Sequence, residues 1–235
     1  NYLNSKKIGT GVKGTANEGS VAEHVMTFFL QLTKNILLYD EVKRKGGFQE
    51  KGGLPPFFEL FQKNVLILGF GRIGQAVAKR CLGFEMNVYV YDPYVELKII
   101  EESDCHPISI NEGFQVADFI SIHLPLNQET KSLINRRSFQ EMKNNCVIVN
   151  TARGGIINEQ DLYDALKENK IQAAGLDVFE QEPPPIDHPL FALPNILVTP
   201  HNAALSLECR KRMAIEVCET VSFYLKDKEK LNVQN

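Results

Sequence analysis

The sequence lacks the marks of several protein classes. Its 26 Lys and Arg residues are balanced by 29 Asp and Glu residues, for a net charge of −3, and no basic cluster is present. Nucleic-acid binding requires a positive surface, so we expect a small-molecule or protein partner and no nucleic acid. No apolar run approaches the roughly 18 residues of a membrane span, and the first residues lack the charged-then-apolar layout of a signal peptide. We therefore expect a cytoplasmic protein without membrane contact.

Cysteine is scarce and irregularly placed. The five residues are Cys81, Cys105, Cys146, Cys209 and Cys218. They are odd in number and contain no C-x-x-C pair, which argues against a disulfide framework and a zinc site. We expect reduced thiols, mostly in the interior. The histidines at positions 24, 106, 123 and 188 have no second ligand at metal-binding spacing, so we also expect no metal.

The composition is that of a globular chain. Hydrophobic residues make up 43% and charged residues 23%, with 16 glycines and 11 prolines, which argues against disorder and collagen-like repeats. At about 150 residues per domain, 235 residues make roughly one and a half domains. The chain begins with Asn rather than Met, and we expect it to be a fragment of a longer protein.

The N-terminal part contains the pattern of a long helix. Ser20 stands three residues before Glu23, as in a capping box. Apolar residues follow at helical spacing, at Val25, Phe28, Phe29, Leu32 and Ile36. Basic residues at 43–45 and two following glycines favour a helix end. We predict one helix over residues 20–45 and a loop rich in Gly and Pro over 46–59.

From residue 64 onward, short apolar runs alternate with amphipathic segments. The runs cover 65–68, 88–91, 119–122, 147–149, 174–178 and 196–198, and the amphipathic segments include 73–82, 138–142 and 161–167. Strands without polar alternation are typical of a sheet covered on both faces. The alternation predicts a Rossmann-type α/β fold with a doubly wound parallel sheet. A last helix is predicted over 206–225, followed by a fraying charged tail.

A glycine-rich hexamer follows the first predicted strand. Gly69, Gly71 and Gly74 form a G-x-G-x-x-G pattern that leads directly into a helix, the context of a dinucleotide pyrophosphate site. The alternative is a tight strand-to-helix turn without ligand. Asp92 ends the second strand at the position of an acid that binds the adenine ribose, the alternative being a solvated loop acid before Pro93. With no basic residue beside Asp92, the pattern favours NAD over NADP.

Three reactive side chains follow the later strands. Arg153, Glu182 and His201 come after the runs at 147–149, 174–178 and 196–198, at the sheet edge where ligands bind in open α/β folds. Taken singly, they could be a surface cation, a solvated loop acid and a histidine that caps the last helix. Together they suit hydride transfer at a carbon bearing oxygen, where a planar cation binds a carboxylate and an acid–base pair serves the carbonyl oxygen.

Several longer motifs carry a resemblance to a known family. They are NEGSVAEH at 17–24, GFGRIG at 69–74 with YDP at 91–93, HLPL at 123–126 followed by Thr130, NTARGG at 150–155, GLDVF at 175–179 with EP at 182–183, and TPH at 199–201. In this order they resemble the D-isomer-specific 2-hydroxyacid dehydrogenases, most closely the phosphoglycerate dehydrogenase-like branch. The similarity runs from about residue 9 to 201 and beyond.

The resemblance implies a role for each matching residue. Arg153 resembles the substrate-binding arginine, His201 the catalytic histidine and Glu182 its acid partner, since a nearby carboxylate stabilises a protonated imidazole. Asp177 resembles the partner of the nicotinamide carboxamide. The resemblance places the following residues at NAD: Gly69, Gly71, Arg72, Ile73, Gly74, Asp92, Leu124, Thr151, Ala152, Arg153, Asp177, His201 and Ala203. The sequence after His201, at 202–205, departs from the common family pattern, which puts substrate contacts there in doubt.

The resemblance also implies a domain layout. Residues 1–14 would be a remnant of a substrate domain, 15–205 the NAD-binding Rossmann domain, and 206–235 a helix returning to the substrate domain. The helix at 20–45 would lie between domains and at a homodimer contact that extends to about residue 61. Most of the substrate domain would be absent from this sequence.

The function implied is NAD-dependent interconversion of a small 2-oxo acid and its D-2-hydroxy acid, such as 3-phosphoglycerate. A rival is an NAD(H)-sensing binding protein, because the C-terminal binding protein corepressors share this fold and trio. A third alternative is a fragment that is inactive without its N-terminal half.

Overall fold

The computed structural model describes residues 16–47 and 56–232, with side chains up to residue 225. The predicted remnant at 1–14 lies outside the described residues, as does most of the predicted loop at 46–59. Of the helices within the described ranges, none is long and apolar enough to cross a membrane. All five cysteines are free, and four of them are buried, which confirms the interior position expected for most of them.

Seven parallel strands form one sheet in the order β3-β2-β1-β4-β5-β6-β7. The strands are β1 (Asn64–Leu68), β2 (Asn87–Tyr91), β3 (His106–Pro107), β4 (Phe119–Ile122), β5 (Val147–Asn150), β6 (Ala173–Leu176) and β7 (Ile196–Val198). The order reverses between β1 and β4, so the loops at their carboxyl ends diverge and leave a crevice, as in doubly wound folds. The predicted fold class is therefore confirmed.

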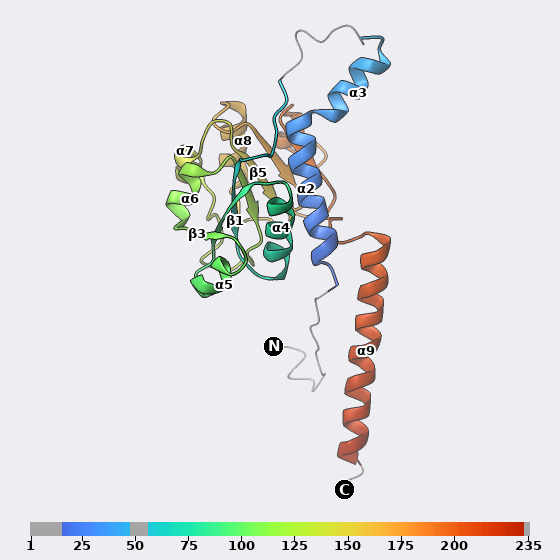
Figure 1. The fold of residues 1–235 in the computed structure, drawn as a ribbon. Helices are drawn as coiled ribbons and strands as arrows, with labels where there is room; N and C mark the ends of the chain where they lie inside the picture. Colours follow the sequence, from blue (N-terminus) through green and yellow to red (C-terminus); the bar gives the residue numbers. More distant parts are fainter. Residues whose placement is uncertain (1–15, 48–55, 233–235) are drawn as a thin grey trace.

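Helices cover both faces of the sheet (Figure 1). They are α2 (Glu18–Lys34), α3 (Ile36–Arg44), α4 (Arg72–Gly83), α5 (Leu97–Glu101), α6 (Ile110–Val116), α7 (Arg136–Glu141), α8 (Glu159–Lys167) and α9 (Leu207–Asn232), with a 3-10 helix η1 (Pro189–Ala192). On one face α2 and α4 bury Phe28, Phe29 and Val77. On the other, α7 and α8 bury Phe139 and Leu162. Fully burying a side chain of this size stabilises the fold by about 1.5–3 kcal/mol, so the hydrophobic clusters on both faces of the sheet stabilise the fold.

The prediction of a single helix over 20–45 is wrong. Asn35 adopts a left-handed conformation with φ of 51° and separates α2 from α3. Asn tolerates this conformation better than other residues with a Cβ atom. The first helix begins at Glu18 rather than at Ser20, whose hydroxyl instead donates a hydrogen bond to the carbonyl of Ala203 at 2.6 Å. The start of α2 is thus tied to the loop before α9.

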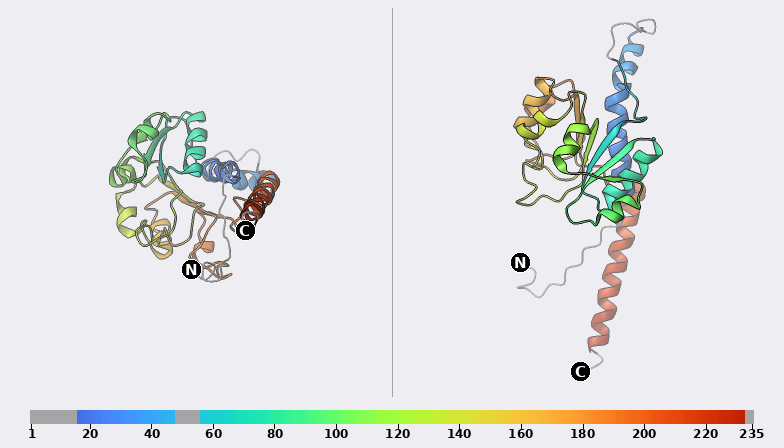
Figure 2. Two further views of the ribbon diagram at one scale, coloured as in Figure 1. Left: turned by 90° about the horizontal axis from the view of Figure 1, so that it is seen from below. Right: turned by 60° about the vertical axis from the view of Figure 1, so that its left-hand side comes forward.

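The C-terminal helix is longer than predicted and extends away from the sheet (Figures 1 and 2). It begins at Leu207 and continues to Asn232, beyond the predicted fraying point at residue 225. Near its start, Cys209 is buried and Nε of Arg212 donates to the carbonyl of Ala16 at 3.0 Å. Further along, Val217 and Val221 are exposed. Only the first part of α9 therefore packs on the body of the protein.

Candidate active site

The glycine turn after β1 is packed tightly against its neighbours. Gly69 has φ of +94°, and a Cβ atom there would lie 2.7 Å from the carbonyl oxygen of His123. A Cβ atom on Gly74 would lie 2.1 Å from the carbonyl oxygen of Gly69, whereas one on Gly71 would meet nothing within 4 Å. Two of the glycines thus serve close packing, and the third leaves open backbone at the start of α4.

Asp92 lies beside this turn, as predicted. Its Oδ2 accepts a hydrogen bond from the backbone N–H of Phe70 at 2.8 Å, and its Oδ1 accepts one from Tyr94 at 2.9 Å. The carboxylate therefore fixes the glycine turn against the end of β2. This structural contact was not predicted, because the partner is a backbone group that the sequence pattern does not reveal.

The loop after β5 presents Arg153 at the same edge. The buried side chain of Asn150 shapes this loop: its Oδ1 accepts from the N–H of Ala152 at 3.0 Å and its Nδ2 donates to the carbonyl of Arg153 at 2.9 Å. The guanidinium of Arg153 is exposed, and its Nη1 donates to the carbonyl of Ala152 at 2.6 Å. Arg153 is therefore available to a ligand.

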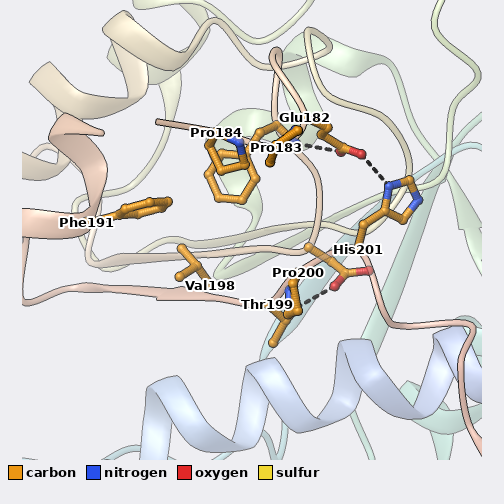
Figure 3. A pocket seen from close by; sticks show the side chains of 10 residues that line it. Glu182, Pro183, Pro184, Phe191, Val198, Thr199, Pro200 and His201 are labelled. Atoms are coloured by element: carbon orange, nitrogen blue, oxygen red, sulfur yellow. Dashed lines mark hydrogen bonds and ion pairs between the residues drawn. The ribbon is translucent and has the colours of Figure 1, made fainter. Parts of the chain in front are cut away.

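Glu182 and His201 form a close pair (Figure 3). Nδ1 of His201 lies 2.6 Å from Oε2 of Glu182, and Oε1 of Glu182 accepts from the N–H of Phe179 at 3.0 Å. Burial raises the pKa of the Glu182 carboxyl, but the hydrogen bonds and the charges of His201 and Arg153 outweigh it and hold the pKa below its ordinary value. Because an ionised carboxylate only accepts, the ring donates from Nδ1. This leaves Nε2 for a second partner.

The loop that carries His201 is organised by Asp177, which is 1% exposed. The hydroxyl of Thr199 donates to Oδ1 of Asp177 at 2.5 Å, and the N–H groups of Asn202 and Ala203 donate to its two carboxylate oxygens at 2.9 Å. His201 itself has a left-handed φ of 52°. The resemblance implied a contact of Asp177 with nicotinamide, and the structure adds that this carboxylate holds a side chain before His201 and two backbone N–H groups after it.

His24, on α2, extends this network from behind. Its Nε2 lies 3.0 Å from the Thr199 hydroxyl oxygen and 3.9 Å from Oδ1 of Asp177. Because the hydroxyl already donates to Asp177, the ring donates to the hydroxyl. Burial lowers the pKa of His24, and the charge of Asp177 partly opposes this effect. A half-buried, neutral His24 thus connects α2 to the loop that carries His201.

A cavity of about 600 Å³ lies at the carboxyl edge of the sheet. It is lined by Asn17, Val21, Ile73, His123, Leu124, Pro125, Leu126, Thr151, Ala152, Arg153, Asp177, His201, Ala203 and Ala204. Eight of these are predicted site residues, from Ile73 at the glycine turn to Ala203 after His201. In the described part of the chain, the buried hydroxyl of Thr151 has no hydrogen-bond partner. An unpaired buried hydroxyl on a cavity wall suits a polar ligand.

Not all of the predicted residues line this cavity. Five of them lie at the glycine turn and outside the wall of this cavity: Gly69, Gly71, Arg72, Gly74 and Asp92. Glu182 contacts the cavity only through His201. It lines a second, more apolar cavity of about 410 Å³ behind the Glu182–His201 pair, together with Phe179, Pro183, Pro184, Phe191, Val198 and Pro200 (Figure 3).

The wall also includes His123, a partly buried histidine for which the sequence analysis predicted no role. Nε2 of His123 lies 2.8 Å from the hydroxyl oxygen of Ser121, and burial lowers the pKa of His123 to about 3. A ring with this pKa is neutral at physiological pH. His123 is therefore unsuited to proton transfer, and it supports the wall and the glycine turn.

The fold and site define a dinucleotide-binding domain of dehydrogenase type, and comparison with known proteins agrees. Residues 26–203 match the family described as D-isomer specific 2-hydroxyacid dehydrogenase, NAD binding domain. The chain belongs to this family.

Individual relatives show how much of a full protein is present. A D-3-phosphoglycerate dehydrogenase of Methanocaldococcus jannaschii is 41% identical over 223 residues, which cover 94% of this chain and 42% of the relative. A hydroxypyruvate reductase of Thermotoga maritima is 41% identical, and the match covers 92% of this chain and 71% of the relative. The solved structure of D-lactate dehydrogenase from Aquifex aeolicus with NAD and lactic acid has a TM-score of 0.86 and 29% identity. The match covers 96% of this chain and 72% of the solved one. The chain thus spans less than half of the first relative.

Proposed function

We propose that this chain is the nucleotide-binding and catalytic part of an enzyme that interconverts a small 2-oxo acid and its D-2-hydroxy acid with NAD. The observation that carries the proposal is the Glu182–His201 pair, which lies at the rim of the same cavity as Arg153 and Ile73. An acid–base group, a substrate-binding cation and a dinucleotide turn are the parts that this reaction needs.

The residues around the cavity fit NAD. The open backbone at Gly71 and the start of α4 suit a pyrophosphate, and Asp92 suits a ribose. The hydroxyl of Thr151 suits a polar group deeper in the cavity. When bound, the nicotinamide supplies or accepts the hydride exchanged with the substrate carbon.

The protein side chains would supply binding and proton transfer. The planar guanidinium of Arg153 can form two parallel hydrogen bonds to a substrate carboxylate. Nε2 of His201 would donate a proton to the carbonyl oxygen in reduction and remove the hydroxyl proton in oxidation. Glu182 would stabilise the protonated ring and hold it at the orientation seen in the structure.

We propose a 2-oxo acid and its D-2-hydroxy acid as the substrate pair because the names of the relatives point to such compounds. One relative is named for 3-phosphoglycerate and another for hydroxypyruvate. The shared feature of these compounds is a carboxylate next to the reacting carbon, which matches Arg153 beside His201. Within this class we favour a phosphorylated acid such as 3-phosphoglycerate.

The domain layout and assembly are part of the proposal. Residues 206–235 would pack on a substrate domain, since Val217, Val221 and Leu225 are exposed along α9. A homodimer contact would include α3, where Ile36 and Leu37 are 56% and 63% exposed. Apolar side chains grouped in this way favour a protein interface. We also propose a cytoplasmic location, because all five cysteines are free thiols.

The test is NADH oxidation by the full-length natural protein and by this 235-residue chain, with glyoxylate, hydroxypyruvate and 3-phosphohydroxypyruvate. We expect turnover by the full-length protein with at least one acid. The matched variant is His201→Ala, which should abolish turnover while the dissociation constant for NADH stays within a few-fold. NADH binding without turnover in the wild-type protein would overturn the proposed enzyme activity and favour a nucleotide-sensing role.

A further inference from the structure

A second carboxylate–histidine pair lies on the other side of the turn that carries Glu182. Nε2 of His188 is 3.1 Å from Oε2 of Glu159, at the start of α8, and the two side chains are 14% and 17% exposed. The pair joins residues 29 positions apart in the sequence. Neither residue lines the cavity that holds His201 and Arg153. The pair is therefore separate from the substrate side of the site.

Both nitrogens of the His188 ring are already engaged. The backbone N–H of Leu190 donates to Nδ1 at 3.3 Å, so Nδ1 carries the lone pair and Nε2 carries the hydrogen that is donated to Glu159. The ring has no free nitrogen to exchange a proton with a substrate. Its role is therefore to hold Glu159 and η1 in place.

Glu159 in turn holds the backbone next to Glu182. Its Oε1 accepts from the N–H of Glu180 at 2.6 Å, and the N–H of Glu159 donates to Oε1 of Glu180 at 3.1 Å. The preceding N–H, that of Phe179, donates to Glu182. Two successive backbone N–H groups are thus bound by two carboxylates, each of which binds a histidine with its other oxygen.

The side chain of Phe179 is fixed by the same set of residues. Its ring centroid lies 5.7 Å from that of His188 and 5.7 Å from that of Phe191, both in edge-on arrangements. The turn at 179–182 is therefore held by hydrogen bonds on its backbone and by aromatic packing on its side chain.

We propose that Glu159 and His188 are positioning residues that hold the 179–182 turn so that Glu182 meets His201. The inference rests on the proposed function. Catalytic geometry is sensitive to displacements of about 1 Å, and within the turn the Glu182 carboxylate is held by one backbone N–H group, that of Phe179. Loss of the Glu159–His188 pair would therefore loosen the Glu182–His201 pair.

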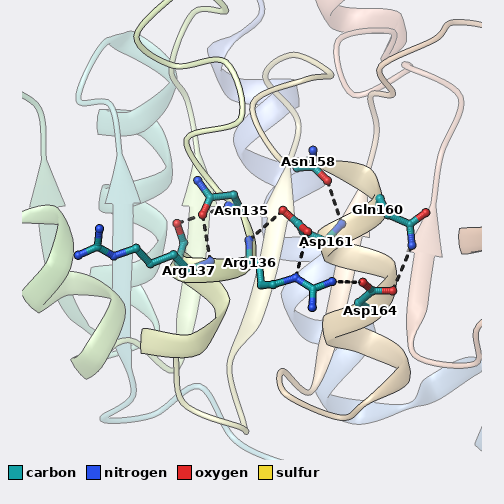
Figure 4. Close-up of polar contacts among 8 residues, drawn as sticks. Asn135, Arg136, Arg137, Asn158, Gln160, Asp161 and Asp164 are labelled. Atoms are coloured by element: carbon teal, nitrogen blue, oxygen red, sulfur yellow. Dashed lines mark hydrogen bonds and ion pairs between the residues drawn. The ribbon is translucent and has the colours of Figure 1, made fainter.

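The test uses substitutions that cut one contact at a time. In His188→Asn the amide oxygen can still accept from Leu190, but no donor reaches Glu159. In Glu159→Gln the amide oxygen can still accept from Glu180, but the charge that binds His188 is lost. The matched control is Asp161→Asn. Asp161 lies in the same turn of α8 but accepts from the N–H of Arg136 at 2.9 Å, on the side that faces α7 (Figure 4).

The measurements are steady-state kinetics of the full-length protein and hydrogen exchange at the amides of Phe179 and Glu180. For both variants we expect kcat for reduction to fall on the order of tenfold, with KM for NADH within twofold. The two amides should exchange faster. The control should match the wild type in all three measurements.

Two results would overturn the positioning role. One is a kcat and amide exchange equal to those of the wild type in both variants. The other is an equal loss in the Asp161→Asn control, which would indicate general damage to α8. If the wild-type protein has no turnover, the proposed function fails, and amide exchange alone decides whether the pair holds the turn.

Discussion

Gly154 and Phe179 approach so closely that no side chain fits between them. A Cβ atom on Gly154 would lie 1.8 Å from the carbonyl oxygen of Phe179 and 2.7 Å from the backbone nitrogen of Glu180. This contact joins the loop of Arg153 to the turn of Glu182, so the two functional side chains share one support.

Gly154→Ala should therefore disturb both side chains. Because the colliding atoms are backbone, we expect a loss of about 1–3 kcal/mol in the free energy of unfolding and a lower kcat for the full-length protein. Urea denaturation and steady-state kinetics measure the two effects. An unchanged free energy of unfolding and an unchanged kcat would show that the two loops can move apart without loss of stability or activity.

The glycine turn allows packing to be separated from cofactor binding. In Gly71→Ala the new methyl group meets no protein atom within 4 Å, whereas in Gly74→Ala it meets the carbonyl of Gly69 at 2.1 Å. We expect Gly71→Ala to keep the stability within about 0.5 kcal/mol and to weaken NADH binding, measured by fluorescence titration. Gly74→Ala should lower both the stability and the affinity for NADH. Unaltered NADH affinity in Gly71→Ala would exclude a close approach of the cofactor at this position.

Asp92→Ala should change both cofactor preference and the turn. The carboxylate would repel a 2′-phosphate, and it also accepts hydrogen bonds from Phe70 and Tyr94. We expect weaker NADH binding, a smaller preference for NADH over NADPH, and a loss of stability of about 1–2 kcal/mol. Titration with both nucleotides checks the preference. An intact preference would mean that another residue recognises the ribose.

His123 should contribute to acid sensitivity. Burial lowers the pKa of His123 to about 3 in the folded chain, compared with the ordinary histidine value of 6.5. As pH falls below 6.5, the unfolded chain gains a proton that the folded chain does not, so stability is present above this pH and is lost below it. The free energy of unfolding should fall by about 1 kcal/mol per pH unit below pH 6.

Urea denaturation at pH 6.5, 5.5 and 4.5 measures this slope. In His123→Asn the contribution should disappear, which makes the pH dependence of the variant shallower than that of the wild type. Equal slopes in the two proteins would show that His123 is protonated in the folded state.

The parts of the fold set by local pattern could be predicted. Continuous apolar runs gave six of the seven strands within two residues, since most of these strands are buried on both faces and show little polar alternation. The two-residue strand β3 (His106–Pro107) was missed because it has no such run. The break at Asn35 was missed because the apolar spacing continues to Ile36 and hides a backbone conformation that only the structure reveals.

Candidate site residues were predictable as a group, but their supports were not. The position of Glu182 and His201 after neighbouring strands predicts that they meet, and they lie 2.6 Å apart. The hydrogen bonds of Asp177 to the loop at 199–203 and the Glu159–His188 pair depend on side-chain directions and on backbone donors. Such contacts leave no spacing signal in a single sequence.

The strand order reverses between β1 and β4, and the candidate site residues fall into two groups, one on each half of the sheet. The half with β1, β2 and β3 carries the glycine turn and Asp92, and the half with β5, β6 and β7 carries Arg153, Glu182 and His201. On the proposed function, substitutions in the first half alter which nucleotide is used, while those in the second alter the proton chemistry. The two properties can therefore change independently in evolution or by engineering.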